Sequence, residues 1–319
     1  MVVLNLNGDR FLEPCFTALL GQEAPGGRDL ILLDNGSDDG GPERVESLFS
    51  EVRVIRLGSN LGFAGAYNRV FSALPHEYIV IVNNDTRARP GWLAGLVAAA
   101  DSDPDVGAVT SKLVFAGRPG VLQSAGTLLL NDGGGADRGS GQRDEGQFEK
   151  REEVFAFNGG SALLRRAALE EVGGFDERFF AYYEDTDLSW RLRLRGWRIL
   201  YEPASVIDHV HSGTNGEWSD FFTFHVDRNR LLMLIKNASP RFVAGALRRV
   251  GARTATGGAG AVSAGRRTPR HYGRVLGSLA ANLPAAVLAR VRIRGRMTVG
   301  DGDVESWVVP REKWDAPSG

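Results

Sequence analysis

Cysteine is almost absent from this sequence, and its absence excludes two classes of site. Cys15 is the only cysteine, so neither an internal disulfide nor a metal site built from several cysteines can form. Cys15 lies in the apolar pattern of a predicted helix. We therefore expect it to pack in the core and not to act as a nucleophile.

Long apolar runs and targeting signals are also lacking. No stretch of about 18 uninterrupted apolar residues occurs, which is the length that suggests a membrane-spanning helix. The first ten residues, MVVLNLNGDR, have neither the basic flank nor the apolar stretch of a secretory signal. We therefore expect a cytoplasmic protein. Because the sequence begins almost inside its first predicted strand, we also expect its natural start to lie upstream.

Two well-known phosphate-binding loops are missing as well. The sequence contains no G-x-x-x-x-G-K-[ST] loop, and no G-x-G-x-x-G follows the first predicted strand. If a nucleotide binds to this protein, side chains and a metal ion must hold its phosphates.

Charge is distributed unevenly along the 319 residues. The net charge is −1 and 43% of the residues are hydrophobic, which allows a full buried core. Residues 241–300 contain twelve arginines and no Asp, Glu or Lys, whereas residues 301–319 contain two basic and five acidic residues. The remaining 24 basic and 34 acidic residues lie in 1–240. We predict an acidic domain over 1–240 and an Arg-rich, mostly helical C-terminal extension over 241–319.

Short β-branched runs alternate with amphipathic stretches over the first hundred residues. Strands are predicted at 2–6, 29–34, 52–57 and 78–83, and helical spacing follows each of them. This alternation implies right-handed βαβ crossovers and an α/β fold with a mainly parallel sheet. In such sheets, ligands bind beyond the carboxyl ends of the strands.

Polar side chains or glycine-rich turns follow all four predicted strands. The strands lead to Asn5 and Asn7, to DNGSDDG at 34–40, to GSNLGFAGAYN at 58–68 and to NND at 83–85. Each segment alone has an ordinary explanation, because Asn, Asp and Gly are common in turns. Their convergence on one edge of the sheet predicts a ligand site. A carboxylate there can bind one side of a Mg2+ or Mn2+ ion whose other positions are filled by water and phosphate oxygens.

Four of these segments together resemble the family 2 glycosyltransferases of the GT-A fold, especially their rhamnosyltransferase-like branch. The segments are VVLNLNG, ILLDNGSDDG, NLGFAGAYN and IVNNDTRARPGW. The resemblance implies that 1–240 is a GT-A catalytic domain with a mainly parallel sheet flanked by helices. It also implies an inverting, metal-dependent transfer of a sugar such as rhamnose. The donor would be a dTDP-, UDP- or GDP-sugar, and the acceptor a saccharide or a lipid-linked molecule.

The resemblance also assigns residues to the donor and to the cation. Asp34 is implied to bind the base or ribose, although capping of the 34–40 turn is an alternative. The other residues expected at the donor are Asn5, Asn7, Asn60, Gly62, Phe63, Gly65, Asn68 and Asn84. Family members carry the cation on an Asp-x-Asp motif, and here Asn83 replaces the first acid. Asp85 is then the charged metal ligand, which Asn83 supports through its amide oxygen or a bound water.

The second half of the acidic domain supplies the predicted base. Residues 131–153 are polar and glycine-rich, which predicts a mobile loop or a β-excursion, or else an uninvolved insert. The aromatic run RFFAYY leads into Glu184 and Asp185, a setting that makes a carboxylate more basic, although helix capping is an alternative. This segment resembles the family pattern GGFDE...F..Y.EDxDL..R. The resemblance implies that Asp185 is the general base, with Glu184 as second choice, and that Asp185 faces Asp85 across one cleft.

A strand and two histidines are predicted around this segment. Residues 155–164 alternate like a strand. His209 and His211 lie two residues apart, so on a strand they face the same way. The resemblance places a histidine here near the metal or the diphosphate, and His209 aligns best with it. A structural role is the alternative.

The basic extension suggests a partner. Arginines interleaved with Ala, Val, Leu and Gly suit a helix that makes peripheral contact with an anionic membrane surface, on the inner face for a cytoplasmic protein. Alternatively, they neutralise the acidic domain. We expect no nucleic-acid partner, because no RNA- or DNA-reading motif accompanies the charge. Two other functions stay open: a sugar-phosphate nucleotidyltransferase, which shares the sheet type, and a non-catalytic nucleotide-sugar binding protein.

Overall fold

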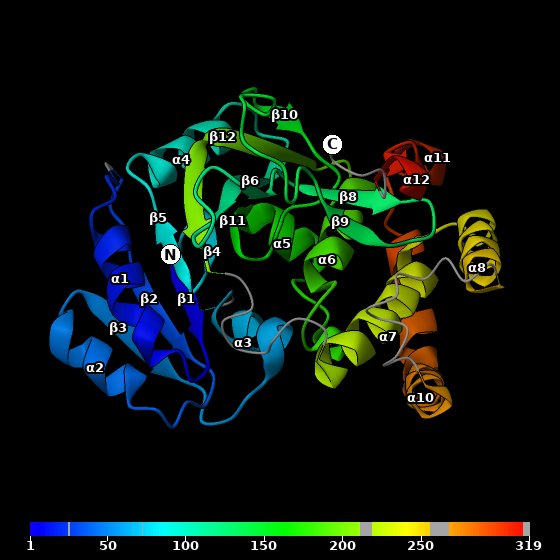
Figure 1. The fold of residues 1–319 in the computed structure, drawn as a ribbon, viewed down its shortest axis with the longest axis horizontal. Helices are drawn as coiled ribbons and strands as arrows, with labels where there is room; N and C mark the ends of the chain where they lie inside the picture. Colours follow the sequence, from blue (N-terminus) through cyan, green and yellow to red (C-terminus); the bar gives the residue numbers. More distant parts are fainter. Residues whose placement is uncertain (25, 72, 211–218, 256–267, 315–319) are drawn as a thin grey trace.

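The centre of the molecule is a β-sheet with helices on both faces (Figure 1). The computed structural model describes residues 1–314 apart from residues 25, 72, 211–218 and 256–267. The first four strands are parallel and lie in the order β3-β2-β1-β4. They are β1 (Val2–Asn5), β2 (Leu30–Asp34), β3 (Val52–Arg56) and β4 (Tyr78–Asn83). All four predicted strands are confirmed, and their carboxyl ends meet at one edge of the sheet.

Beyond β4 the sheet continues with strands of mixed direction. β11 (Ser161–Arg165) is antiparallel to both β4 and β6 (Val106–Phe115), and β12 (Arg198–His209) is parallel to β6. Three short strands complete it. They are β5 (Thr86–Ala88) and β10 (Glu152–Glu153), which pair with β12, and β7 (Leu122–Ser124), which pairs with β6. Because β5 pairs with β12, the end of β12 lies beside the end of β4.

Helices bury both faces of the sheet. One face is covered by α1 (Asp9–Leu20), α2 (Gly41–Leu48) and α4 (Trp92–Asp101). The other is covered by α3 (Gly62–Phe71), α5 (Arg166–Val172) and α6 (Glu184–Leu194). β2 is buried along its whole length, as expected for a parallel strand covered on both faces. Cys15 is buried in α1, and burial raises the pKa of its thiol to about 12.

A second, small sheet contains part of the polar segment 131–153. It has the order β13-β8-β9, with β8 (Thr127–Leu130), β9 (Gly135–Asp137) and β13 (Val308–Val309). Since β9 and β10 both lie in 131–153, the predicted β-excursion is confirmed. The strand predicted over 155–164 is wrong in its first part, because β11 begins only at Ser161. Before it the chain turns at Asn158, whose Oδ1 accepts from the backbone N–H of Gly160 at 2.8 Å.

The C-terminal part is helical and contacts the rest of the molecule. Its helices are α7 (Asp220–Asn237), α8 (Pro240–Ala255), α10 (Pro269–Arg294), α11 (Asp301–Glu305) and α12 (Arg311–Trp314). α7, α8 and α10 lie together at the right of Figure 1. β13 pairs with β8, and Arg311 forms a salt bridge with Asp132. The extension is therefore tied to the 1–240 part, and a domain boundary near residue 240 stays a prediction.

Candidate active site

The ends of β4 and β12 bring a carboxylate, an imidazole and an amide together. Asp85 follows β4 and His209 ends β12, and Asp85 Oδ1 lies 3.0 Å from His209 Nε2. The other ring nitrogen, His209 Nδ1, lies 2.8 Å from Oε1 of Gln123 on β7. Only 8% of Asp85 and 6% of His209 are exposed. The sequence predicted this pair but not Gln123, which lies in no recognisable motif.

Asp85 and His209 fit one side of the coordination shell of a divalent cation. Carboxylate oxygen suits Mg2+ and Mn2+, and imidazole is a common metal ligand. The Gln123 contact at Nδ1 leaves Nε2 directed toward Asp85. Among the described residues, no group of three or more His, Cys, Asp or Glu side chains surrounds a metal position. A cation here would need substrate phosphates and water to complete its shell. His211 lies outside the described residues.

Amide side chains at the ends of β1 and β4 bind one another. Asn84 Nδ2 donates to Asn5 Oδ1 at 2.6 Å, and Asn5 Nδ2 donates to Ser37 Oγ at 3.0 Å. The backbone N–H of Asn7 also donates to Ser37 Oγ at 3.0 Å. A Cβ at Gly8 would lie 2.0 Å from Asn84 Nδ2, so only glycine leaves room for this amide. The structure thus gathers the three predicted asparagines at one edge, and their contact with a donor stays a prediction.

The turns after β2 and β3 are joined by further amides. The Asp34 carboxylate accepts from the backbone N–H of Ser37 at 3.2 and 3.3 Å, which is the turn cap that the sequence left as an alternative. Asn35 Nδ2 donates to Asn60 Oδ1 at 3.0 Å, and Asn35 Oδ1 accepts from the backbone N–H of Leu61 at 2.8 Å. Asn35 was not predicted, because its position inside a polar turn gives no separate signal. It connects the predicted residues Asp34 and Asn60.

α3 carries the remaining predicted donor residues, Gly62, Phe63, Gly65 and Asn68. Gly62 has a φ of 71°, and a Cβ there would lie 2.5 Å from the carbonyl oxygen of Phe180. Asn68 Nδ2 donates to the carbonyl of Phe175 at 2.8 Å, and its Oδ1 accepts from the backbone N–H of that residue at 3.0 Å. Asn68 therefore holds the 175–180 segment against α3, and Gly62 leaves room for its close approach. Phe63 is half-buried, and a Cβ at Gly159 would lie 3.2 Å from its Cζ.

Asp185 and Glu184 begin α6 and differ in their surroundings. Asp185 is half-buried, and its carboxylate accepts from the backbone N–H groups of Gly159 at 3.0 Å and Thr186 at 2.6 Å. Burial raises the pKa of Asp185, and these hydrogen bonds partly oppose the rise. Burial and the adjacent Asp185 raise the pKa of Glu184 well above its ordinary value. Glu184 Oε2 is buried without a hydrogen-bond partner among the described residues. Asp185 is thus the carboxylate that combines raised basicity with access to solvent.

The loop before α6 has an unusual backbone conformation. Phe180, Tyr182 and Tyr183 have φ values of 64°, 69° and 70°. Such left-handed conformations cost about 1–3 kcal/mol each in non-glycine residues. Asn229 of α7 stabilises the loop by donating to three of its carbonyl oxygens, at 2.7, 2.8 and 2.9 Å. Arg228 donates to two carbonyl oxygens of the same segment, at 2.8 and 3.0 Å. α7 therefore fixes the approach to Asp185.

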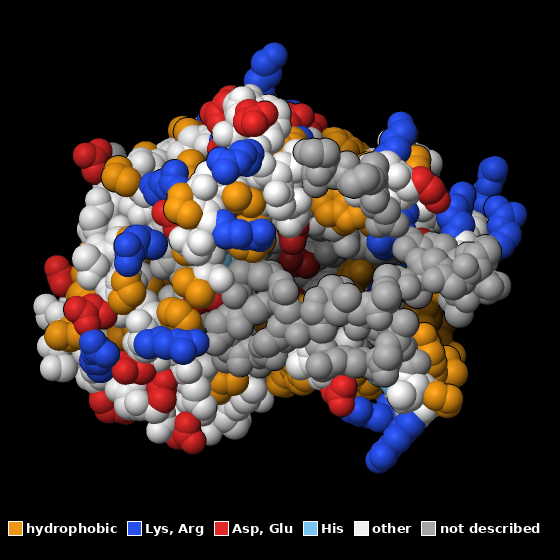
Figure 2. Space-filling model, viewed as in Figure 1, with side chains coloured by type: hydrophobic (Ala, Val, Ile, Leu, Met, Phe, Trp, Pro, Cys, Tyr) orange, Lys and Arg blue, Asp and Glu red, His pale blue; other side chains and the backbone are white. Residues whose placement is uncertain are grey.

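Two glycines connect Asp185 with the end of β4. Gly159 donates to the Asp185 carboxylate, and the carbonyl of Gly160 accepts from the backbone N–H of Asn83 at 3.0 Å. Asp85 lines a cavity of about 480 Å³ between α1 and the ends of β5, β6 and β12, and Asp185 is not among its lining residues. Figure 2 shows a hollow near the centre of one face with acidic atoms inside it. That Asp85 and Asp185 face one bound substrate stays a prediction.

Comparisons with known proteins identify the family. The model of glycosyl transferase family 2 matches residues 1–173. N-acetylglucosaminyl-diphospho-decaprenol L-rhamnosyltransferase of Mycobacterium tuberculosis is 32% identical over 210 residues, which cover 59% of this chain and 68% of that protein. The chain belongs to glycosyltransferase family 2. Its similarity to that relative supports the rhamnosyltransferase-like branch.

Solved structures confirm the GT-A fold of this family 2 glycosyltransferase. GalNAc-T7, solved with UDP, GalNAc and Mn2+, aligns with a TM-score of 0.62 at 14% identity, covering 76% of this chain and 48% of that one. A mannosyltransferase of Pyrobaculum calidifontis, solved with GDP-Man and Mn2+, aligns with a TM-score of 0.54 at 18% identity, covering 92% and 84%. At such identities the likeness concerns the fold.

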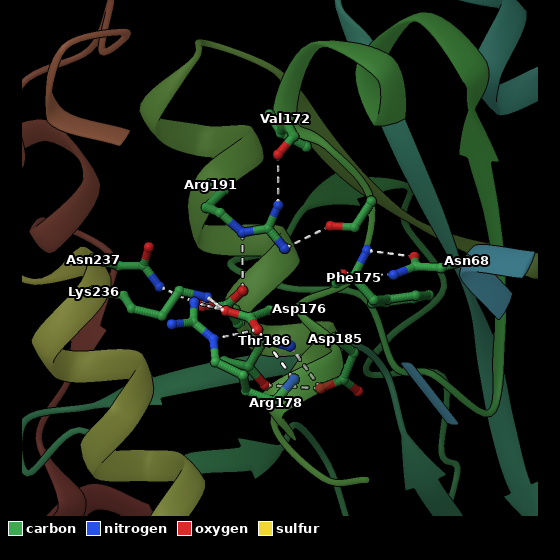
Figure 3. A network of polar contacts seen from close by, with 12 residues as sticks. Asn68, Val172, Phe175, Asp176, Arg178, Asp185, Thr186, Arg191, Lys236 and Asn237 are labelled. Carbon is green, nitrogen blue, oxygen red and sulfur yellow. Dashed lines mark hydrogen bonds and ion pairs between the residues drawn. The ribbon is translucent and has the colours of Figure 1, made fainter. Parts of the chain in front are cut away.

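A buried charge network holds the glycosyltransferase helix that carries Asp185 (Figure 3). Lys236 of α7 donates to Asp187 Oδ1 at 2.7 Å and also to Asp176. Arg191 donates to the other oxygen of Asp187 at 2.9 Å. The third acid of the EDTD segment is thus structural, whereas Asp185, two residues earlier, lies at the Gly159 turn. A second cavity, of about 450 Å³, borders this network and is lined by none of the predicted site residues.

Proposed function

We propose that this protein is an inverting, divalent-metal-dependent hexosyltransferase that moves a sugar from a nucleotide-diphosphate donor to an acceptor hydroxyl. One observation carries the proposal: Asp185, a half-buried carboxylate with a raised pKa, is linked through Gly159 and Gly160 to the end of β4, two residues before Asp85. Inversion requires the hydroxyl to attack the anomeric carbon from the face opposite the departing diphosphate. That geometry needs a base on one side and a diphosphate-binding group on the other.

Each residue of the site has a role in this reaction. Asp185 accepts the proton of the acceptor hydroxyl as that oxygen attacks, while the backbone N–H groups of Gly159 and Thr186 orient its carboxylate. Asp85 and His209 would hold Mg2+ or Mn2+, which when bound offsets the negative charge that develops on the leaving diphosphate. The amides at the ends of β1 and β4 and the turn residue Asp34 bind the nucleotide part of the donor.

For the substrates we propose a dTDP-linked rhamnose as donor and a saccharide or lipid-linked molecule as acceptor. The support is the similarity to the M. tuberculosis protein, whose name specifies L-rhamnosyl transfer to N-acetylglucosaminyl-diphospho-decaprenol. The corresponding setting is the synthesis of a cell-wall polysaccharide in the cytoplasm, at the inner face of the membrane. UDP- and GDP-sugars are the other donors to test, as the solved structures with UDP and GDP-Man suggest.

Donor and metal binding are tested by calorimetric titration with a panel of nucleotide sugars, with and without Mn2+. One donor should bind, and it should bind more tightly with Mn2+. Asp85→Asn should lose most of this gain, because it removes the charged ligand. Failure of every nucleotide sugar to bind would contradict the proposed function as a whole.

The base is tested with Asp185→Asn. Turnover should fall by about 10²–10⁴-fold, the usual contribution of a positioned base, while donor affinity is retained. Glu184→Gln should lower turnover far less, because Glu184 is buried away from solvent. Unchanged transfer by Asp185→Asn would contradict the assignment. Donor binding by the wild-type protein without transfer to any acceptor would favour a binding protein. Release of pyrophosphate from a nucleoside triphosphate and a sugar phosphate would favour a nucleotidyltransferase.

A further inference from the structure

α10 exposes a continuous strip of apolar side chains. Tyr272, Leu276, Leu283, Val287 and Val291 are 45%, 60%, 42%, 46% and 62% exposed. Their spacing of four or seven residues places them on one side of the helix. From the first to the last, the strip spans about 30 Å of helix. A strip of this length on an otherwise folded protein indicates a surface that meets an apolar partner.

An adjacent side of α10 is already occupied. Val275 and Ala286 are buried, and α10 packs along α7. His271 Nε2 lies 3.0 Å from Asp227 of α7, and Arg290 donates to two carbonyl oxygens at the end of α7, both at 2.8 Å. α10 therefore cannot turn its exposed strip inward without losing these contacts.

Basic side chains border the strip. Arg270, Arg274 and Arg292 are exposed on α10, and residues 241–300 contain no acidic residue. Figure 2 shows hydrophobic side chains at the lower right, where α10 lies, with Lys and Arg side chains beside them. An apolar strip flanked by arginines is the pattern of a helix that lies in the interface of an anionic membrane.

We propose that α10 docks the protein on a membrane that contains anionic lipids, with its apolar strip at the boundary between headgroups and acyl chains. A second copy of the chain fits this surface poorly, because a symmetric dimer would place arginines against arginines. Among the described residues, α10 is also the one helix long and apolar enough to cross a membrane. Spanning would require α10 to leave α7 and expose the side that is now buried, so docking on the surface retains the fold.

This docking rests on the proposed function and specifies where the acceptor is met. Asp227, the partner of His271, immediately precedes Arg228 and Asn229, which hold the loop before Asp185. The membrane-facing helix thus packs directly on the helix that positions the predicted base. An acceptor anchored by a lipid tail would reach the site from this surface.

The test is sedimentation of the full chain with lipid vesicles, without donor or acceptor, so that its outcome does not depend on transfer activity. The protein should bind vesicles that contain phosphatidylglycerol and remain in solution with pure phosphatidylcholine. The triple variant Leu276→Ser, Val287→Ser, Val291→Ser should bind at least about tenfold more weakly, because it removes half-exposed apolar side chains. Replacing Arg270 and Arg292 by Gln should weaken binding by about fivefold per arginine.

Matched controls lie elsewhere on the surface. Leu48→Ser on α2 removes a side chain that is 50% exposed and should leave binding unchanged, and so should Arg53→Gln on β3. Circular dichroism of every variant checks the fold. Equal binding to both kinds of vesicle, or unaltered binding by the triple variant, would overturn the proposal. A stable dimer in solution that the triple variant abolishes, without vesicle binding, would assign the strip to a second copy. Cell membranes that release the protein only in detergent would indicate a spanning helix.

Discussion

Replacing Lys236 by Met tests how the helix that carries the predicted base is held. The Lys236 side chain is 2% exposed, and its Nζ donates to both Asp176 and Asp187. Methionine keeps an unbranched, flexible side chain of similar length but removes the charge. Asp187 then keeps Arg191 at 2.9 Å and Asn237 at 2.8 Å, and Asp176 keeps one arginine. The buried Asp187 and the half-buried Asp176 thus lose a shared cation, and neither is left without a partner.

The expected loss of stability follows from this arrangement. Removing one partner of a buried ion pair costs about 3–5 kcal/mol, and the remaining partners favour the lower end of that range. Arg56 provides the comparison, because it pairs with Glu43 and Glu46 while its side chain is 41% exposed. Solvent screens such a pair, so Arg56→Met should cost less than about 1 kcal/mol. The two substitutions remove similar contacts and differ mainly in burial.

The measurement is urea unfolding of both variants, followed by tryptophan fluorescence and by circular dichroism. A double-mutant cycle with Asp187→Asn should show coupling of about 1–3 kcal/mol, since the two residues share one network. If Lys236→Met unfolded at the same urea concentration as Arg56→Met, the reasoning about the buried network would be refuted. An additive cycle would show that Lys236 and Asp187 act independently.

Three further changes test the site. Because the pKa of Asp185 is raised, its carboxylate becomes protonated at a higher pH than that of a free aspartate, so transfer should fall as the pH drops through this raised value. Asp137→Asn removes a charge that contributes to the rise, so the acid limb of the pH–rate profile should move to lower pH; an unmoved limb contradicts this cause. Gly62→Ala places a Cβ 2.5 Å from a carbonyl oxygen, whereas a Cβ at Gly91, also at positive φ, meets no atom within 4 Å. Gly62→Ala should therefore lower the melting temperature more than Gly91→Ala, and equal shifts would show that backbone strain alone matters. Gln123→Leu removes the group beside the predicted histidine ligand and should weaken Mn2+ binding by about 10–100-fold in calorimetry; unchanged affinity would remove Gln123 from the site.

The parallel part of the sheet was predictable because its signal is local. A run such as LILLD at 30–34 is apolar on both faces, which is typical of a strand covered by helices on both sides. The predicted strand at 155–164 failed in its first part for a related reason. Phe155, Ala156 and Phe157 are buried, but the turn at Asn158 and its glycines keeps them out of β11. Ala156 pairs instead with Thr127 in a single antiparallel bridge, and a buried segment of this kind gives the same apolar pattern as a strand.

The residues that position the site were largely hidden in the sequence. Gln123 and Asn35 act through single amide hydrogen bonds, and any polar turn or strand end supplies such amides. Asp187 was visible as part of an acidic motif. Its partner Lys236 lies on another helix, and no sequence pattern connects the two residues. Asn68 and Gly62 were assigned to the donor, and the structure shows that Asn68 also holds the segment before α6 while Gly62 leaves room for it.

The sequence by itself determined the alternation of strands and helices over the first hundred residues, the polar residues at the strand ends and the family, because periodicity and short motifs are properties of neighbouring residues. Only the tertiary structure decided which of these residues meet. The pairing of β5 with β12 sets His209 against Asp85, and the turn at Gly159 joins Asp185 to the end of β4. The packing of α10 on α7 decided which of its apolar residues stay exposed. Contacts between distant segments depend on how whole elements pack, and that information is not contained in any single stretch of the chain.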